Sequence, residues 1–492
     1  MRKRLLCVLL VFSMLSGLCT VVSFGSDETP CTAAPLIVIS GFGTVSLYRD
    51  AGTDHAQKVF APTTQTILKG VGGILLPTFG VLLTHNWDRF CEKADGKIFD
   101  VFETCICDAD GNSVYNVSVT KFPLSADHYP EFYNQDFRDE QAFVKTAIET
   151  IGGDHTYFFS YDWRLDPLDH ADALHEMVLR VKAETGHDKV VLAGCSMGGT
   201  ILLSYLSKYG TDDVQTCIFD NAAIQGITFV GELFCLDLKV DKQVMIDYLL
   251  QFLNCGEKTK QFLNRLLGRL CLVDRIVAFA QDLLDNTQQQ ISRDVLYPMF
   301  GNMPGMWAFV KEADYERAKA SALDPAVNAK LIERIDAYHY GVQCKAKELM
   351  QKALADGCNV FVLANYGKWG VPLTPSMFAC HDYLIDTVLA SGGAVCADNG
   401  TTLPQEYVQQ VQDGHDHISS DSVIDASTCF LPEHTWFIKN MGHLDFPYGS
   451  EGAQLLMWLV QAKAPYTVQS DVRYPQFMVY DPELLTLSPQ TK

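Results

Sequence analysis

The feature that most constrains this chain is a serine set among glycines between a predicted buried strand and a predicted helix. Residues 189–200 read KVVLAGCSMGGT, in which four apolar residues precede Gly194-Cys195-Ser196-Met197-Gly198. A serine on a sharp turn from strand to helix exposes its hydroxyl, and the glycines let the turn approach its neighbours closely. The alternative is an ordinary glycine turn, and the rest of the sequence decides between the two.

Apolar runs that end in glycine or polar turns alternate with segments of helical periodicity. Strands are predicted at residues 34–43, 155–164, 189–194, 216–224, 358–367 and 435–440, and helices at 168–185 and 197–209. Alternating strands and helices favour a parallel sheet that is covered on both faces. We therefore predict an α/β fold built on a mostly parallel sheet.

The character of the chain changes between about residues 230 and 355, where apolar residues follow a helical period. Leu263, Leu266, Leu270, Val273 and Val277 are examples of this spacing. We predict a signal peptide at 1–25, a first core part at 26–229, a helical cap at 230–355, a second core part at 356–464 and an extended tail at 465–492.

The N-terminus has the pattern of a secretory signal. Arg2-Lys3-Arg4 precede an apolar run, and small residues follow at Ser23, Gly25 and Ser26. The sequence thus predicts a secreted or extracytoplasmic protein, with an uncleaved membrane anchor as the alternative. The formal net charge of −21 argues against a nucleic-acid partner, because phosphates need a basic surface.

A serine hydroxyl needs an adjacent base, and in this arrangement the chain order is serine, acid, histidine. His443 follows the predicted strand 435–440 and fits the position of the base. His434 lies before that strand, at its wrong end, and His339 lies in the helical insert. We therefore predict that His443 is the partner of Ser196.

The acid should lie between Ser196 and His443. Residues 413–428 (DGHDHISSDSVIDAST) offer four aspartates, and we choose Asp421 because it stands in a polar turn before Val423. Asp425 is the alternative. The same stretch holds His415-Asp416-His417, for which the sequence identifies no third ligand, so we predict neither a metal nor a cofactor.

Acyl transfer also needs backbone N–H groups that bind the oxyanion. One donor is expected after the nucleophile, at Met197. The second is expected in the early turn Ile39-Ser40-Gly41-Phe42-Gly43, where Phe42 is the first choice and Gly43 the next.

With these residues in place, the chain resembles the lecithin:cholesterol acyltransferase type of α/β-hydrolase, which includes lysosomal phospholipase A2. Four segments carry the resemblance: residues 35–43, Tyr161-Asp162-Trp163-Arg164 with the three residues that follow, residues 194–199, and Asn302 to Trp307. Two features depart from that family: Cys195 stands where a histidine is usual, and S-D-S-V around Asp421 lacks the usual glycines.

The resemblance implies an acyl-enzyme mechanism on a lipid or other ester, with a helical cap over the site. Two roles are open for Tyr161, Asp162, Trp163 and Arg164: they would either contact substrate or fix the loop beside the turn that carries Ser196. Residues 70–83 and 263–284 would form an acyl groove or contact a lipid interface transiently, or else pack as ordinary core.

We therefore expect a secreted serine esterase, lipase or O-acyltransferase. Two alternatives remain at this point. One is a peptidase or amidase with the same triad, since a fold does not fix the bond that is cleaved. The other is a non-catalytic lipid-binding or adhesive protein on the same scaffold.

Overall fold

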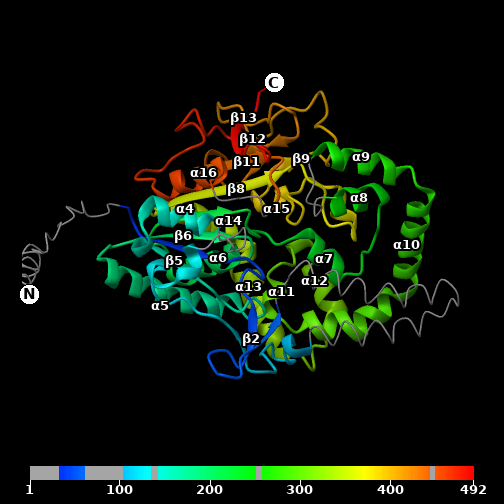
Figure 1. The fold of residues 1–492 in the computed structure, drawn as a ribbon, viewed down its shortest axis with the longest axis horizontal. Helices are drawn as coiled ribbons and strands as arrows, with labels where there is room; N and C mark the ends of the chain where they lie inside the picture. The colour runs from blue at the N-terminus through cyan, green and yellow to red at the C-terminus, as the bar shows by residue number, and fades with distance from the viewer. Residues whose placement is uncertain (1–32, 61–102, 134–141, 251–256, 444–448, 492) are drawn as a thin grey trace, which may run out of the picture. The chain divides into compact units, whose positions relative to one another are not determined.

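An eight-stranded sheet organises the chain in the computed structural model, which describes residues 33–60, 103–133, 142–250, 257–443 and 449–491 (Figure 1). The predicted signal peptide and the apolar segment 70–83 lie outside these residues. The strand order is β13-β12-β11-β8-β7-β6-β1-β5. Its strands are β1 (Leu36–Ile39), β5 (Thr156–Phe159), β6 (Val190–Cys195), β7 (Val214–Asp220), β8 (Asn359–Tyr366), β11 (Thr435–Lys439), β12 (Phe477–Asp481) and β13 (Thr486–Pro489).

Every neighbouring pair from β5 to β12 is parallel, and only β13 runs antiparallel at the edge. The carboxyl ends of the parallel strands therefore share one edge of the sheet. In the register, Ile39 lies beside Gly194, and Cys195 lies beside Asp220. This brings the early glycine turn, the Ser196 turn and the end of β7 together, which is where a ligand site is expected in such a sheet.

Two groups of helices cover the sheet. In one group, α5 and α14 both contact α6; in the other, α4 contacts α16. Strands β1, β5 and β8 are buried along their whole length, as the continuous apolar runs predict for a sheet covered on both faces. These helices are α4 (Ala142–Ile151), α5 (Pro167–Thr185), α6 (Gly198–Tyr209), α14 (Ala346–Ala355) and α16 (Glu451–Val460).

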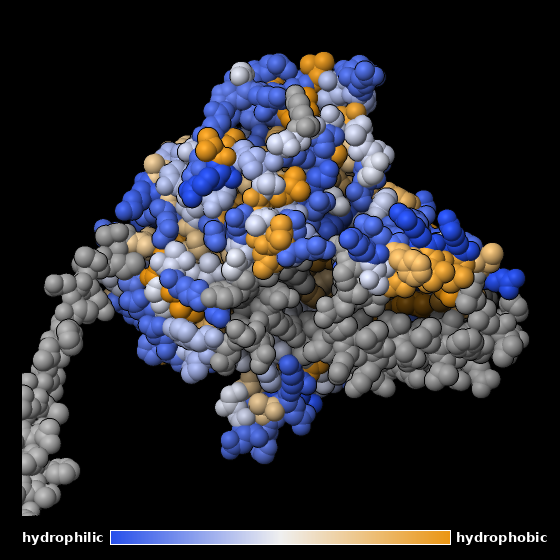
Figure 2. All heavy atoms as spheres, turned by 45° about the horizontal axis from the view of Figure 1, so that its top comes forward, coloured by the Kyte–Doolittle hydropathy of each residue, from blue (hydrophilic) through white to orange (hydrophobic). Residues whose placement is uncertain are grey.

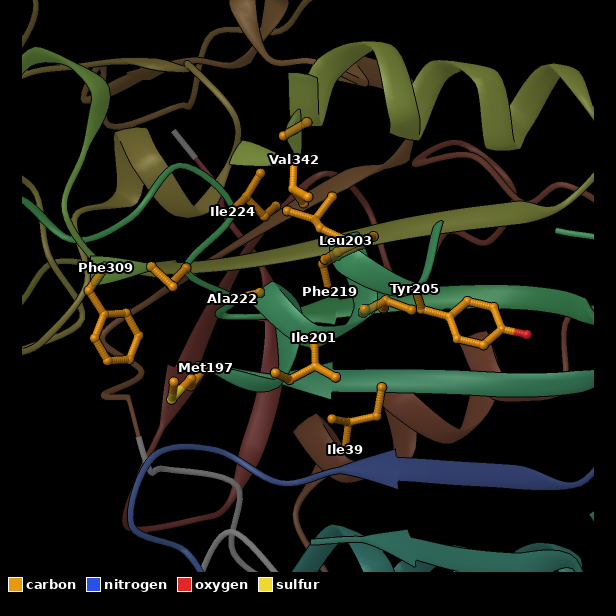
Figure 3. Packing of buried hydrophobic residues seen from close by; sticks show 14 of the residues in the cluster. Ile39, Met197, Ile201, Leu203, Tyr205, Phe219, Ala222, Ile224, Phe309 and Val342 are labelled. Carbon is orange, nitrogen blue, oxygen red and sulfur yellow. The ribbon is translucent and has the colours of Figure 1, made fainter. Parts of the chain in front are cut away.

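Apolar side chains between α6 and the sheet hold the serine turn in place. Figure 3 shows Met197 and Ile201 from the start of α6 packed near Ile39 of β1 and Phe219 of β7. All four side chains are fully buried. The turn that carries Ser196 is thus anchored by the largest hydrophobic cluster of the described residues.

A series of helices lies between β7 and β8, mostly within the range 230–355 for which the sequence analysis expects a helical cap. Its last helix, α14, packs on α6 and β8 and so belongs to the layer that covers the sheet. The other helices of the insert are α7 (Thr228–Phe234), α8 (Lys242–Leu250), α9 (Glu257–Gly268), α10 (Cys271–Ile291), the segment η6 (Ser292–Gly301), α11 (Pro304–Trp307), α12 (Glu312–Ala322) and α13 (Ala329–Gly341).

Smaller elements complete the fold. Strand β2 (Leu47–Arg49) pairs antiparallel with β3 (Gln57–Phe60) and β4 (Val117–Val119), and β9 (Val395–Cys396) pairs with β10 (Ile424–Asp425). A short helix, α15 (Thr387–Ala390), follows β8. None of the described helices is both long enough and apolar enough to cross a membrane.

The C-terminal segment differs from the sequence prediction. Residues 465–492 were expected to form an extended tail outside the core. Instead, β12 and β13 add two strands to the main sheet, and Met478 and Tyr480 of β12 are buried. Their alternation of buried and half-buried residues is that of an edge region with one covered face.

Candidate active site

Ser196 lies on a sharp turn between β6 and α6, and its backbone is strained. Its φ of 53° lies in the left-handed region that non-glycine residues seldom adopt. The turn is held by backbone hydrogen bonds: Ser196 N–H donates to the Asp220 carbonyl (3.0 Å), and the Ser196 carbonyl accepts from Ala223 N–H (3.1 Å). Strain of this kind persists only where the surroundings enforce it.

Three glycines allow this turn to sit against its neighbours. A Cβ on Gly198 would lie 2.5 Å from the Ile39 carbonyl oxygen, and one on Gly199 would lie 2.4 Å from the Ala222 Cβ. A Cβ on Gly194 would meet the backbone of Gly198 at 2.8 Å. The glycines are therefore required by close approach of the backbone, as the sequence predicted.

The structure brings Ser196 and His443 together. Ser196 Oγ lies 2.9 Å from His443 Nε2, and both side chains are buried. His443 Nδ1 lies 2.7 Å from Asp382 Oδ2. Because a carboxylate can only accept, Nδ1 carries the proton and Nε2 presents its lone pair to the serine hydroxyl. This is the arrangement of a nucleophile, a general base and an orienting acid.

Asp382 is held rigidly in the loop that follows β8. Its Oδ1 accepts hydrogen bonds from the N–H groups of Leu384 (2.9 Å) and Ile385 (2.7 Å), which leaves Oδ2 for the imidazole. His443 N–H in turn donates to the Asp382 carbonyl at 2.8 Å. The loop after β8 that carries Asp382, termed the acid loop, is thus joined to His443 through both backbone and side chain.

The sequence prediction of Asp421 as the partner of His443 is wrong. Asp421 Oδ2 bonds Lys439 Nζ at 2.8 Å and the Tyr366 hydroxyl at 3.2 Å, and its Oδ1 accepts from Ser419 Oγ at 2.7 Å. Burial opposes ionisation there, but hydrogen bonds from Lys439 and Ser419 nevertheless lower the pKa of Asp421. This carboxylate is therefore engaged in an ion pair with Lys439.

The alternative, Asp425, does not bond His443 either. Its Oδ1 accepts from Ser427 N–H (2.9 Å), and its Oδ2 accepts from the Tyr407 hydroxyl and from Gln410 N–H (both 2.9 Å). Asp425 thus caps a turn after β10 and ties it to residues 407–410.

Comparison with known proteins agrees with this architecture. A family model described as the alpha/beta hydrolase fold matches residues 122–298, a range that includes Ser196 and ends before Asp382 and His443. Together with the mostly parallel sheet and the serine turn, this match decides the fold. The chain has an α/β-hydrolase fold.

Two further comparisons add little to this hydrolase fold. No curated protein sequence matches the chain. Among solved structures, a chain from "The crystal structure of Tle4-Tli4 complex" is similar over 87% of this chain and 97% of its own length. Its identity is 11% and its TM-score 0.34, so this likeness carries no argument.

The predicted oxyanion segment of the hydrolase lies beside the nucleophile. A Cβ on Gly41 would lie 3.3 Å from the Ser196 Cβ, which places the turn after β1 against the serine. Met197 directly precedes α6, and the N–H groups at a helix start have no partner within the helix. Phe42, Gly43 and Met197 remain predictions as oxyanion donors, with these placements in their favour.

Residues 161–164 are all buried and serve mainly to join segments. Arg164 is fully buried and forms a two-point ion pair with Asp162, with nitrogen–oxygen distances of 2.9 and 2.6 Å. Its Nη1 also donates to the Cys105 carbonyl at 2.8 Å. The Trp163 ring lies 4.4 Å from the Phe42 ring, centroid to centroid. Arg164 therefore fixes this loop, and Trp163 supports the oxyanion segment.

The segment 302–307, which contributed to the family resemblance, packs against the same loop. Gly305 N–H donates to the Arg164 carbonyl at 3.0 Å. A Cβ on Gly305 would lie 2.0 Å from the Trp163 carbonyl oxygen, so only glycine fits. The insert is thus joined to the core beside Phe42.

Asp220 is a second buried carboxyl group at the site that the sequence analysis missed. It ends β7, and its Oδ1 accepts from Asn221 Nδ2 at 3.0 Å. Burial raises its pKa to about 7, and the nearby Asp382 adds to this effect, while His443 opposes it. The sequence signal that could have found it is its position directly after the apolar residues 217–219 of a predicted strand.

A cavity of about 240 Å³ opens onto Ser196, and its other lining residues are all apolar. The oxyanion segment, the insert and the acid loop each contribute to its wall. The lining residues are Phe42, Ile227, Phe229, Val230, Leu233, Phe234, Leu296, Phe300, Met306, Phe309 and Leu384. None of residues 161–164 is among them, which again favours the structural role for that segment.

Proposed function

We propose that this chain is a serine hydrolase that cleaves esters with an apolar acyl group through an acyl-enzyme. The α/β-hydrolase fold indicates a hydrolase in general terms. The more specific proposal of an esterase is supported by the hydrogen-bonded side chains of Ser196, His443 and Asp382 and by the apolar cavity that Ser196 lines.

In the first half of the reaction, Ser196 Oγ attacks the ester carbonyl while His443 Nε2 takes the hydroxyl proton. Asp382 stabilises the imidazolium that forms and holds its tautomer. The tetrahedral intermediate collapses as its carbon–oxygen bond to the alcohol breaks, and His443 returns the proton to the leaving alkoxide. The acyl group is then bound to Ser196.

In the second half, His443 takes a proton from water, and the hydroxide attacks the acyl carbonyl. Collapse releases the carboxylic acid and restores the Ser196 hydroxyl with the proton from His443. Phe42 N–H and Met197 N–H are the proposed donors to the oxyanion in both halves. Each such donor typically contributes about 2.7–4 kcal/mol to transition-state stabilisation.

The apolar lining of the cavity supports a substrate with a hydrocarbon acyl chain. A group that leaves water for such a surface gains roughly 0.8 kcal/mol per buried CH₂. Phe229 and Phe234 approach Ser196 from α7, and Leu384 approaches from the acid loop. The same loop is tied to α7, because Asp386 Oδ2 accepts from Thr228 N–H at 2.8 Å.

Exposed apolar residues on the insert support the expected transient contact with a lipid interface. Phe262 and Leu266 of α9 are one helical turn apart and exposed, as is Ile276 of α10. Figure 2 shows a hydrophobic area on its right, the side on which Figure 1 draws α9 and α10. The signal-like N-terminus adds the proposal that the enzyme acts outside the cytoplasm.

A panel of p-nitrophenyl esters with increasing acyl length, run beside matched anilides, tests this proposal. We expect turnover of the esters with a preference for medium or long acyl chains, and loss of turnover in Ser196→Ala. Faster cleavage of the anilides would favour a peptidase or amidase. Binding of esters without turnover by the folded wild type would favour a lipid-binding protein.

The resemblance to the lecithin:cholesterol acyltransferase type raises a second fate for the acyl group. An added alcohol would compete with water for the same acyl-enzyme, so its acyl ester would accumulate in place of free acid. Product analysis with a long-chain alcohol measures this partition. Free acid as the main product supports hydrolysis, whereas the new ester as the main product assigns the chain to the acyltransferases.

A further inference from the structure

Three side chains with nitrogen or carboxylate ligand atoms, His415, His417 and Glu433, converge at the opposite end of β11 from His443, and Asp413 lies beside His417. His417 Nε2 lies 2.9 Å from Asp413 Oδ2 and 3.3 Å from Glu433 Oε1. His415 Nδ1 lies 3.0 Å from the same Glu433 oxygen. The ligand atoms of His415, His417 and Glu433 all lie within 4.8 Å of one another.

The tautomer of His417 is set by Gln476. The Gln476 Nε2 group donates to the carbonyls of Pro432 (2.7 Å) and Thr435 (3.2 Å), which orients the amide. Its Oε1 therefore faces His417 Nδ1 at 2.7 Å and accepts the proton of that nitrogen. Nε2 of the neutral ring then directs its lone pair at the two carboxylates.

Lone pairs that face one another repel unless a proton or a metal ion lies between them. His417 is only 1% exposed, so water does little to screen this repulsion. In a tetrahedral zinc site with metal–ligand bonds of about 2.0–2.1 Å, neighbouring ligand atoms are roughly 3.3–3.4 Å apart. The Glu433 oxygen lies 3.0 Å from His415 and 3.3 Å from His417, which comes close to that spacing and suits a small dication.

We propose that His415, His417 and Glu433 form a structural zinc site, with Asp413 beside His417. Imidazole nitrogen with carboxylate oxygen is a ligand set for zinc, whereas calcium and magnesium prefer oxygen alone. The Gln476 carbonyl supplies the outer hydrogen bond that a metal-bound histidine usually makes. A surface hollow bordered by His415, His417 and Gln469 gives the ion a route from solvent.

Such an ion would fasten the C-terminal strands to the sheet. His415 and His417 belong to the loop before β10, and Glu433 belongs to the turn before β11. Gln476 directly precedes β12, and its carbonyl accepts from Phe437 N–H at 2.8 Å. Three segments distant in the sequence would thus be held at one point. The proposal goes beyond the proposed hydrolysis and does not depend on it.

Zinc titration of the untagged, full-length protein tests the site. After EDTA treatment and transfer to metal-free buffer, we expect one zinc ion per chain, measured by competition with a chromophoric chelator. Zinc should raise the melting temperature, and millimolar calcium or magnesium should not. Glu433→Gln and His415→Gln should weaken zinc affinity at least about 100-fold and remove the thermal shift.

Asp416→Asn is the matched control, because it lies between the two histidines and points to Ile418 N–H (3.2 Å). This variant should bind zinc as the wild type does. Glu433 and His415 are chosen because they are partly exposed, so their replacement leaves the fold intact, which circular dichroism checks. The proposal is overturned if the folded wild type retains no zinc, or if both ligand variants bind it with unchanged affinity.

Discussion

Ser196 and Asp382 both lie at the carboxyl edge of the main sheet, but their surroundings are specified over different distances in the sequence. The serine turn is marked by glycines within a few positions of it, although two of the close contacts that require them, with Ile39 and Ala222, are distant in the sequence. Asp382 reaches His443 across 61 positions, and nothing adjacent to it in sequence marks it. A local sequence pattern therefore marks the nucleophile, whereas no local pattern marks its acid.

The assignment of the acid is tested most strongly by replacing each of the two candidate aspartates in a separate variant. Asp382→Asn should lower kcat for an ester by about 10⁴-fold, because the amide favours the wrong tautomer of His443. Asp421→Asn, which removes the charge paired with Lys439 but no contact of His443, should leave kcat close to the wild-type value. Steady-state kinetics on both variants measures this. Equal losses, or a larger loss in Asp421→Asn, would return the acid to its sequence-predicted position.

Asp220, at the end of β7, lies at the same edge of the sheet, and its ionisation gives a second test. Because burial raises its pKa from 3.8 to about 7, the folded state holds a proton that the unfolded state releases. The resulting stability is complete below about pH 4 and is lost as the pH rises through 7. By linkage, the free energy of unfolding should fall by at most about 4 kcal/mol over this range.

Asp220→Asn lacks this ionisation, so its stability should change less between pH 4 and pH 8 than that of the wild type. Chemical denaturation of both proteins across this range provides the comparison. Parallel stability curves for the two proteins would mean that Asp220 ionises as freely in the folded chain as in the unfolded one.

The close packing of the turn that carries Ser196 is tested by replacing one of its glycines. Gly198→Ala should reduce the free energy of unfolding by about 1–3 kcal/mol, because the new Cβ would overlap the Ile39 carbonyl. It should also lower ester turnover, since the serine turn must move. Gly341→Ala is the matched control, because no heavy atom lies within 4 Å of the added Cβ. A Gly198→Ala variant as stable as this control would contradict the account.

The smallest effect on ester turnover is expected where the acid loop, which carries Asp382, also forms part of the cavity wall. Leu384 lines the cavity two residues after Asp382, so Leu384→Ala should lower kcat/KM for long-chain esters by about tenfold. The acetate ester, which has no hydrocarbon chain to bury, should be cleaved nearly as by the wild type. Equal losses on both esters would instead mean that the substitution disturbs Asp382.

Most of the fold was predictable from the sequence, because buried parallel strands are continuous apolar runs. Ser196 and His443 followed from their places beside such runs. Asp382 was not predicted because the polar turn before β10 was preferred, although β10 belongs to a separate two-stranded sheet with β9 and takes no part in the main sheet. The loop after residues 358–367 was the better place to search, since that run precedes the last predicted strand and ends at the same edge.

The C-terminal strands and the cluster around His417 escaped prediction for a related reason. Strands β12 and β13 form the edge of the sheet, where half-buried alternation replaces the continuous apolar run. Glu433 stands 16 positions beyond His417, and the two side chains meet beside Gln476, which precedes β12. Features that depend on contacts distant in the sequence left no local pattern.

The most direct test of the account is covalent labelling with a fluorophosphonate, followed by intact mass and peptide mapping. We expect a single adduct on the peptide that contains Ser196, formed rapidly by the wild type and by Asp421→Asn. We also expect no adduct in Ser196→Ala and much slower labelling in Asp382→Asn. A folded wild type that stays unlabelled with detergent present, or an adduct on another serine, would contradict the account.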